Sequence, residues 1–269
     1  MPPQPIRVLV VDDSVVIRRL VSGILDEDPA IEVAGMAVDG SAALRDLDRF
    51  KPDLVTLDVE MPVMDGLTTL KELRKVAPRL PVIMFSTLTE RGASTTLDAL
   101  SAGASDYVTK PSNVGSVEAG MAAVRDQLLP KIKALVPRPG SGDPLPGDGA
   151  RARAGARPAP SSTDGPATGA DTAAKPSLGP LLRLPPPGDL PEAGLERVDI
   201  VTIGVSTGGP NALEATIPLL PADFPVPIVI VQHMPPIFTK HLADRLNQLS
   251  PLKVMEATAN EVLTPGTVF

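Results

Sequence analysis

Short apolar runs alternate with amphipathic stretches from residue 6 to about residue 130. After Ser14, apolar side chains recur with the 3.6-residue spacing of a helix that buries one face. The stripe comprises Val16, Ile17, Leu20, Val21, Ile24 and Leu25. The strands that the apolar runs predict are IRVLVV (6–11), IEVAGMAV (31–38), DLVTL (53–57), PVIMF (81–85) and SDYVT (105–109). Further helices are predicted at 41–49, 66–77, 90–102 and 114–129.

Five repeats of strand and helix are typical of an α/β protein with a doubly wound parallel sheet. We therefore expect residues 5–130 to form one flavodoxin-like, five-stranded domain. The periodicity disappears over residues 137–196, where Pro, Gly, Ala and Ser dominate, and this composition predicts a disordered linker. Its arginines, Arg151, Arg153 and Arg157, could form a basic docking patch, although solubilising charge in low-complexity sequence is the favoured interpretation.

The apolar pattern returns at residue 197. VDIVTIGV (198–205) and VPIVIVQHM (226–234) predict two buried parallel strands, with helices after each. LKVMEA (252–257) indicates a third strand, and the final PGTVF indicates the start of another. We expect residues 197–269 to be a second parallel α/β domain of Rossmann-like type, incomplete because so few strands give a marginal core.

Composition excludes several classes of protein. The net charge of −7 argues against nucleic-acid binding, which needs clustered Lys and Arg. There is no Cys for a disulfide or a thiolate metal site. No stretch resembles a signal peptide, and no apolar run approaches the ~18 residues of a membrane span. We expect a soluble, cytoplasmic protein that is not inserted in the membrane.

Acidic side chains gather at the predicted carboxyl ends of two strands: Asp12 and Asp13 follow the first, and Asp58 follows the third. In the flavodoxin-like strand order these two strands are neighbours and flank the crevice where ligands bind. Three carboxylates there suit Mg²⁺, which leaves coordination positions open for a phosphate.

Ser86 and Lys110, at the ends of strands four and five, add a hydroxyl and an ammonium that we expect to face the same crevice. Any single residue of this kind is more often a turn or cap residue, but groups at successive strand ends favour a phosphoryl-accepting site.

The motifs VVDDS, LDVEMPVMDG, FST and GASDYVTKP, over about residues 5–130, resemble the receiver domain of response regulators. The resemblance implies that Asp58 accepts the phosphoryl group and that Lys110 contacts it. It implies metal ligands from Asp12, Asp13, Asp58 and the Val59 carbonyl. It also implies that the Ser86 hydroxyl swings toward the phosphate and that Tyr107 rotates inward, although an aromatic residue on a strand is often only packing.

A second candidate site lies at Gly204-Val205-Ser206-Thr207-Gly208, between a predicted strand and a helix. The frame Gly-x-Ser-x-Gly exposes a serine on a sharp turn, and His233 follows the next strand, within plausible reach of it. By itself the frame fits a phosphate-binding loop equally well. The other histidine, His241, falls in a polar helix, where we expect it at the surface.

IGVSTGGPNAL, IVIVQHMPPIFT and LTPGTVF resemble the catalytic domain of the CheB family of chemotaxis protein-glutamate methylesterases. The resemblance implies Ser206 as nucleophile, His233 as general base, and Thr207 as a residue that shapes the site. It implies a regulated carboxylic ester hydrolase that demethylates glutamyl esters and deamidates glutamines of methyl-accepting chemoreceptors in sensory adaptation. A histidine kinase is the implied phosphodonor.

The aspartate of that family's triad has no good candidate here. Asp199 starts the strand that ends at Ser206, and Asp244 lies on a helix leading away from His233. We expect the acid beyond Phe269, so the activity of these 269 residues is open. One alternative is a phospho-switch whose output domain binds a partner without catalysis. A DNA-binding regulator is disfavoured because no basic helix-turn-helix pattern follows the linker.

Overall fold

The computed structural model describes residues 4–111, 117–137 and 198–269. The predicted linker of residues 137–196, with its three arginines, lies outside the described residues apart from residue 137.

The first sheet has five parallel strands in the order β2-β1-β3-β4-β5, which confirms the flavodoxin-like prediction. Its strands are β1 (Ile6–Val11), β2 (Ile31–Ala37), β3 (Leu54–Asp58), β4 (Val82–Ser86) and β5 (Asp106–Thr109). Each lies within one or two residues of the predicted run. Strands β3, β4 and β5 are buried along their whole length, as continuous apolar runs in a parallel sheet should be.

Six helices connect and follow these strands in the described residues. They are α1 (Val15–Asp26), α2 (Gly40–Arg45), α3 (Leu47–Phe50), α4 (Gly66–Val76), α5 (Glu90–Ser101) and α6 (Val117–Leu135). Four begin at a side chain that accepts a hydrogen bond from a backbone N–H of the first turn: Ser14, Asp39, Asp65 and Thr89. The predicted helix 41–49 divides at Asp46, and the helix predicted to stop at residue 129 continues past Pro130 to Leu135.

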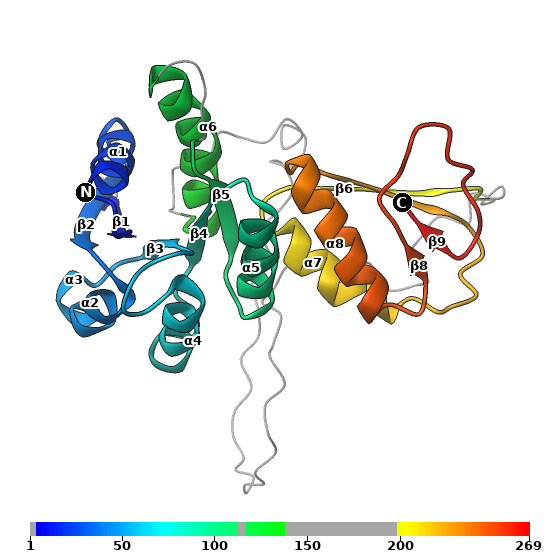
Figure 1. Cartoon of the computed structure of the whole chain (residues 1–269), viewed down its shortest axis with the longest axis horizontal. Helices are drawn as coiled ribbons and strands as arrows, with labels where there is room; N and C mark the ends of the chain where they lie inside the picture. The colour runs from blue at the N-terminus through cyan, green and yellow to red at the C-terminus, as the bar shows by residue number, and fades with distance from the viewer. Residues whose placement is uncertain (1–3, 112–116, 138–197) are drawn as a thin grey trace, which may run out of the picture. The chain divides into compact units, whose positions relative to one another are not determined.

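Two apolar clusters cover the two faces of the first sheet. Helices α1 and α6 pack together over one face (Figure 1), and α2, α4 and α5 cover the other. The α1 stripe is confirmed for Val21, Ile24 and Leu25 but is wrong for Val16, which is 66% exposed. Position 16 lies in the first turn of α1, whereas the buried residues of this helix begin at Val21.

The second sheet has four parallel strands in the order β6-β7-β9-β8. The strands are β6 (Val201–Val205), β7 (Ile228–Gln232), β8 (Lys253–Val254) and β9 (Thr267–Val268). Helix α7 (Gly209–Thr216), the 3₁₀ turn η1 (Ile217–Leu219) and α8 (Pro236–Leu249) connect them. The second parallel α/β fold is therefore confirmed, and the strand expected from PGTVF is present.

The prediction of fully buried strands is wrong for β6 and β7. Residues along β6 alternate between exposed and half-buried, and Val231 of β7 is 68% exposed. The apolar residues before β6, Val198 and Ile200, are also exposed. Among the described residues, α7 and α8 pack on this sheet, and nothing covers the outward side chains.

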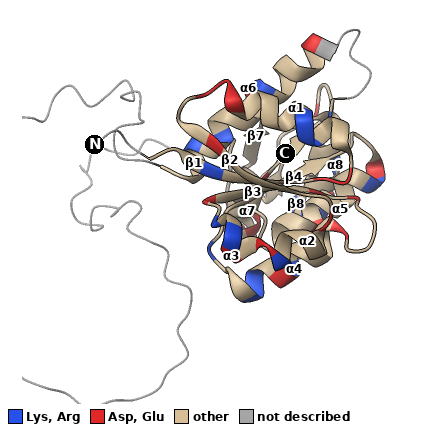
Figure 2. Ribbon diagram, turned by 90° about the vertical axis from the view of Figure 1, so that its left-hand side faces the viewer, with Lys and Arg blue, Asp and Glu red and all other residues tan. Residues whose placement is uncertain are grey.

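Both sheets belong to one compact unit, in which α5 packs against α7 and α8. In Figure 2 the strands are mostly uncharged, while residues of both signs are distributed over the outer helices. None of the described helices has the length and apolar character needed to span a membrane.

Candidate functional site

The acidic pocket forms at the carboxyl ends of β1 and β3. These strands pair directly, with Val11 opposite Leu57, so that Asp12 and Asp58 follow side by side. Both carboxylates are buried, and Asp13 is exposed at the rim. One carboxylate oxygen from each of the three lies within 4.8 Å of the others. The predicted convergence of the three carboxylates is therefore present.

Lys110 reaches into this pocket from the end of β5. Its Nζ lies 2.7 Å from Asp58 Oδ2 and 3.0 Å from Asp12 Oδ2. Burial raises the pKa of Asp58 to about 6, with Asp12 adding to the rise and Lys110 opposing it. Burial works against the charge of Lys110, but its two carboxylate partners outweigh burial and raise the pKa of Lys110. The ammonium therefore stays charged between the two buried carboxylates.

The donor set fits a hard divalent cation. Asp12 Oδ2 and Asp58 Oδ2 are buried and accept no hydrogen bond, so the Lys110 ion pair is what the described residues offer them. Mg²⁺ prefers such carboxylate oxygens and usually keeps several waters. The pocket is open to water on the side of the exposed Asp13. The Val59 carbonyl accepts a hydrogen bond from Gly66 N at 3.0 Å, and its role as a metal ligand stays a prediction.

Gly66 allows the chain to pass close behind Asp58. A Cβ at this position would lie 2.1 Å from the Asp58 carbonyl oxygen, far inside contact distance. Only glycine fits without moving the backbone that carries Asp58.

Ser86 ends β4 as predicted, but its hydroxyl does not face the pocket. The side chain is fully buried, and its Oγ donates toward Gly92 O at 3.1 Å and accepts from Thr96 Oγ1 at 2.7 Å, both on α5. The expectation that it faces the crevice is therefore wrong for this structure. A buried hydroxyl takes the available acceptor, and the first turn of α5 offers one.

Tyr107 on β5 is buried, and its predicted inward rotation stays a prediction. Its ring stacks on Phe238 of α8, with centroids 4.8 Å apart and planes within 4°. Lys131 of α6 approaches the Tyr107 ring, with its Nζ 4.9 Å from the ring centroid. Burial, with the Asp106 carboxylate adding to it, raises the pKa of the Tyr107 hydroxyl, so the phenol stays neutral.

The serine turn connects β6 to α7. Ser206 and Thr207 are exposed, and Gly208 has φ +71°, a left-handed conformation that favours glycine. A Cβ on Gly209 would lie 2.0 Å from Gln232 Oε1, so the second glycine permits close approach of the neighbouring strand.

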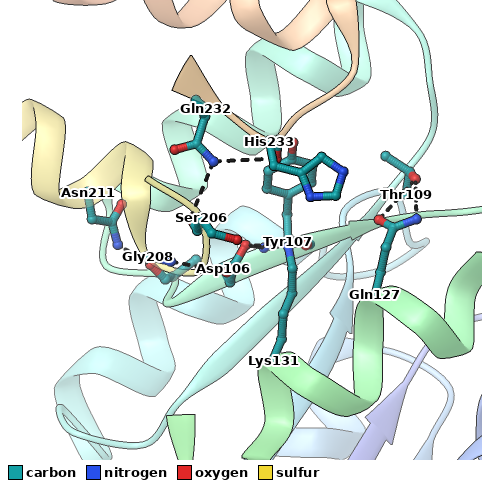
Figure 3. Close-up of polar contacts among 11 residues, drawn as sticks. Asp106, Tyr107, Thr109, Gln127, Lys131, Ser206, Gly208, Asn211, Gln232 and His233 are labelled. Carbon is teal, nitrogen blue, oxygen red and sulfur yellow. Dashed lines mark hydrogen bonds and ion pairs between the residues drawn. The ribbon is translucent and has the colours of Figure 1, made fainter. Parts of the chain in front are cut away.

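His233 lies at the adjacent strand end, as the sequence predicts. Val205 is paired with Gln232, and His233 N donates to Val205 O at 3.4 Å. Gln232 Nε2 donates to Ser206 O at 3.3 Å and to His233 O at 3.4 Å, so one amide links both strand ends (Figure 3). No hydrogen bond joins the Ser206 hydroxyl to the His233 ring among the described contacts.

No carboxylate among the described residues has a recorded contact with the His233 ring. Asp244 pairs instead with Lys240 on α8, at 2.7 Å. The expectation of a triad acid beyond Phe269 stays a prediction.

A cavity of about 450 Å³ opens beside the serine turn. Ser206, Thr207 and His233 line one side, and Asp106, Tyr107 and Lys131 from the first domain line the other, as Figure 3 shows for all but Thr207. Sequence reasoning missed Asp106, Thr96, Lys131 and Gln232 as site residues. Asp106 was visible inside the motif GASDYVTKP, but Lys131 lay beyond the predicted end of its helix.

Comparison with known proteins gives two family matches. The response regulator receiver domain matches residues 8–121, and the CheB methylesterase matches residues 201–269. Among curated relatives, the chain is 50% identical over 263 residues to the protein-glutamate methylesterase/protein-glutamine glutaminase of Nocardioides sp., covering 98% of this chain and 64% of that protein.

It is 41% identical over 280 residues to the protein of the same name from Alkalilimnicola ehrlichii, covering 97% of this chain and 69% of the relative. The Bacillus subtilis relative is 42% identical over 265 residues, covering 98% and 66%. The chain thus spans about two thirds of the length of these relatives. With a receiver match followed by a methylesterase match, and relatives of this name at 41–50% identity, the chain belongs to the CheB family of protein-glutamate methylesterases/protein-glutamine glutaminases.

Proposed function

We propose that this protein is a phosphorylation-regulated protein-glutamate methylesterase and protein-glutamine glutaminase that acts on methyl-accepting chemoreceptors in the cytoplasm. The observation that carries the proposal is the cavity beside Ser206 and His233, whose other wall is the receiver's Asp106, Tyr107 and Lys131. A hydrolase site whose wall belongs to a phospho-acceptor domain suits control of access by phosphorylation.

In the phosphoryl step, an Asp58 carboxylate oxygen attacks the phosphorus atom of the donor. A new O–P bond forms, and the bond from phosphorus to the donor's leaving group breaks. Lys110, 2.7 Å from Asp58, is placed to neutralise charge on the transferred group. Asp12, Asp13 and Asp58 would hold Mg²⁺, which supplies further neutralisation when bound. The proposed donor is a chemotaxis histidine kinase.

In the hydrolase step, Ser206 Oγ attacks the side-chain carbonyl of a receptor glutamyl ester or glutamine while His233 takes its proton. Methanol or ammonia leaves with the proton returned by His233, and a glutamyl-serine ester remains. Water, deprotonated by His233, then cleaves that ester and regenerates Ser206. In the present arrangement Ser206 and His233 are exposed neighbours that have yet to form their hydrogen bond.

Helix α5 provides a physical route between the two sites. Its Thr96 holds the Ser86 hydroxyl, and Asp98 on the same helix pairs with Arg245 of α8 at 2.8 Å. Arg245 also pairs with Glu214 of α7 at 2.6 Å. A phosphate that draws Ser86 away from Thr96 would therefore alter the helix that holds α7 and α8.

The direct test is methanol release from a methylated receptor fragment, with Mg²⁺ and with or without acetyl phosphate. We expect acetyl phosphate to stimulate methanol release by the wild type. In Asp58→Ala this stimulation should be lost. Ser206→Ala should abolish release while Asp58 is still phosphorylated. Release that survives Ser206→Ala would contradict the proposed nucleophile.

A second function remains open because no contact orients the His233 ring in the described structure. In that function the protein is a phospho-switch that binds receptors without hydrolysing them. Ser206→Ala separates the two: it abolishes the output of an esterase and leaves the output of a binding protein intact.

A further inference from the structure

We propose that Asp106 is an internal ligand of the serine turn: its carboxylate occupies the backbone N–H of Gly208 and is withdrawn when the receiver is phosphorylated. The inference rests on the proposed function and specifies how the receiver controls the hydrolase. It assigns a role to a buried carboxylate that the phosphoryl chemistry does not use.

Asp106 is buried, with 2% of the residue exposed, and both oxygens of its carboxylate accept hydrogen bonds. Oδ2 accepts a hydrogen bond from Gly208 N at 3.1 Å, across 102 residues of sequence. Oδ1 accepts from Tyr107 N and from Lys131 Nζ, both at 2.7 Å. Figure 3 shows this carboxylate between β5 and the serine turn. A buried charge with three donors is held in one position.

Gly208 N is a donor that the turn does not use itself. Gly209 N already donates to Ser206 O at 2.8 Å, and Ala212 N donates to Gly208 O at 3.1 Å in the first turn of α7. The left-handed conformation of Gly208 directs its own N–H to the receiver. This group lies two residues after Ser206 at the N-terminal end of α7, where negative charge is favoured.

A negatively charged oxygen is also what the proposed reaction creates next to Ser206. Attack on the carbonyl gives a tetrahedral oxyanion, and backbone N–H groups at such turns stabilise it. A carboxylate oxygen 3.1 Å from Gly208 N has the charge and the hydrogen-bonding character of that oxyanion. While Asp106 is bound, this donor is unavailable to substrate.

Lys131 and Tyr107 connect this contact to the receiver switch. Lys131 Nζ donates to Tyr107 O at 2.6 Å as well as to Asp106, and it lies against the Tyr107 ring. Asn211 of α7 donates to Ala104 O at 2.8 Å, just before β5. This is a second hydrogen bond between α7 and the β5 region of the receiver. A movement of Tyr107 should therefore also move the neighbouring Asp106 and disturb its hydrogen bond with Gly208 N.

The test uses the 269-residue chain with ¹⁵N-glycine and follows the Gly208 amide by NMR, which requires no catalysis. A hydrogen bond to a carboxylate moves the amide proton downfield. Asp106→Asn keeps the size of the side chain and removes its charge, so we expect the Gly208 proton to move upfield. The matched control is Asp48→Asn, which removes the charge of an exposed aspartate on α3 and should leave Gly208 unchanged.

Beryllofluoride with Mg²⁺, which mimics the phosphoryl group on Asp58, should shift the wild-type Gly208 resonance toward its position in Asp106→Asn. A Gly208 proton that responds to neither change would overturn the inference, as would one that responds to Asp106→Asn but not to beryllofluoride. The amide of Gly66, which lies beside Asp58, should respond to beryllofluoride in each variant and so reports that the variant is folded.

A fluorophosphonate that labels Ser206 separates this inference from the proposed function. If Ser206 is never labelled, the proposed nucleophile is wrong, while the NMR result still decides the Asp106 contact. If Ser206 is labelled, Asp106→Asn should label several-fold faster without phosphorylation. Equal labelling rates would contradict the inhibitory role.

Discussion

The acidic pocket and the serine turn are built on the same principle and reach different states. Both use the carboxyl ends of neighbouring parallel strands. In the pocket, Asp12 and Asp58 are buried and share the ammonium of Lys110. At the turn, Ser206 and His233 are exposed and unconnected through their side chains.

The difference lies in what covers each strand end. The first sheet carries helices on both faces, so burial and the ion pair fix the side chains of its pocket. The second sheet has outward apolar side chains that the described residues leave uncovered, and the wall beside Ser206 comes from the receiver. One site is organised by its own domain, and the other depends on its neighbour.

Replacement of Asp58, the proposed phospho-acceptor, should produce the largest effect. Asp58→Asn removes the only carboxylate of the pocket proposed as nucleophile, so phosphorylation by acetyl phosphate should be lost entirely. Intact-protein mass spectrometry measures the added phosphoryl group directly. Asp48→Asn, an exposed aspartate on α3, is the matched control and should be phosphorylated like the wild type. Residual phosphorylation of Asp58→Asn at the wild-type level would place the acceptor elsewhere.

The same substitution should stabilise the metal-free protein at neutral pH. The folded pKa of Asp58 is about 6, against 3.8 for an ordinary carboxyl, so its protonated form is favoured in the fold. Its contribution to stability is complete below pH 3.8 and is lost as the pH rises through 6. Because the pKa of Asp58 rises by about two on folding, the charged carboxylate lowers the free energy of unfolding by at most about 3 kcal/mol above pH 6.

Urea unfolding with EDTA should therefore show Asp58→Asn more stable than the wild type at pH 7.5 and little different at pH 3.5. A variant that is less stable than the wild type at pH 7.5 would show that the surroundings of Asp58 stabilise its charged form.

An intermediate effect is expected from the ion pairs that hold α5 to α7 and α8. Arg245→Met keeps the aliphatic stem and leaves Asp98 and Glu214 without their shared cation. Loss of these two ion pairs should weaken the packing of α5 against α7 and α8 by about 1–2 kcal/mol. Faster fluorophosphonate labelling of Ser206 would report it. The matched control is Lys240→Met on the exposed side of α8, where the pair with Asp244 should matter little.

The smallest effect should come from the α5 contact that holds Ser86. Thr96→Val removes the 2.7 Å hydrogen bond to Ser86 Oγ while keeping the shape of the side chain. We expect about 1 kcal/mol in favour of the phosphorylated arrangement, or several-fold tighter beryllofluoride binding, because Ser86 is released. Fluorescence or NMR titration measures the affinity. Weaker binding in Thr96→Val would mean that Thr96 assists the phosphorylated state.

The sequence was sufficient for features that a single strand end determines. Asp12, Asp58 and Lys110 each follow an apolar run, and parallel strand order brings them together. Ser206 and His233 were placed correctly at adjacent ends for the same reason.

Directions and partners set by packing were not predictable. The Ser86 hydroxyl turns to α5 because that helix offers acceptors, and no periodicity encodes this choice. The stacking of Tyr107 on Phe238 and the Asp106–Gly208 bond join residues more than 100 positions apart. Such contacts depend on how two separately predicted α/β units meet, which a local pattern does not contain.

The two apolar clusters have a consequence for how the protein opens. The cluster under α1 and α6 belongs to the receiver alone, whereas the cluster under α4 and α5 continues through Tyr107 and Phe238 into the second sheet. Residues that share one continuous core tend to open as one cooperative unit. In hydrogen exchange, amides of α5 should therefore open together with those of α8, and α1 should keep its protection through that event.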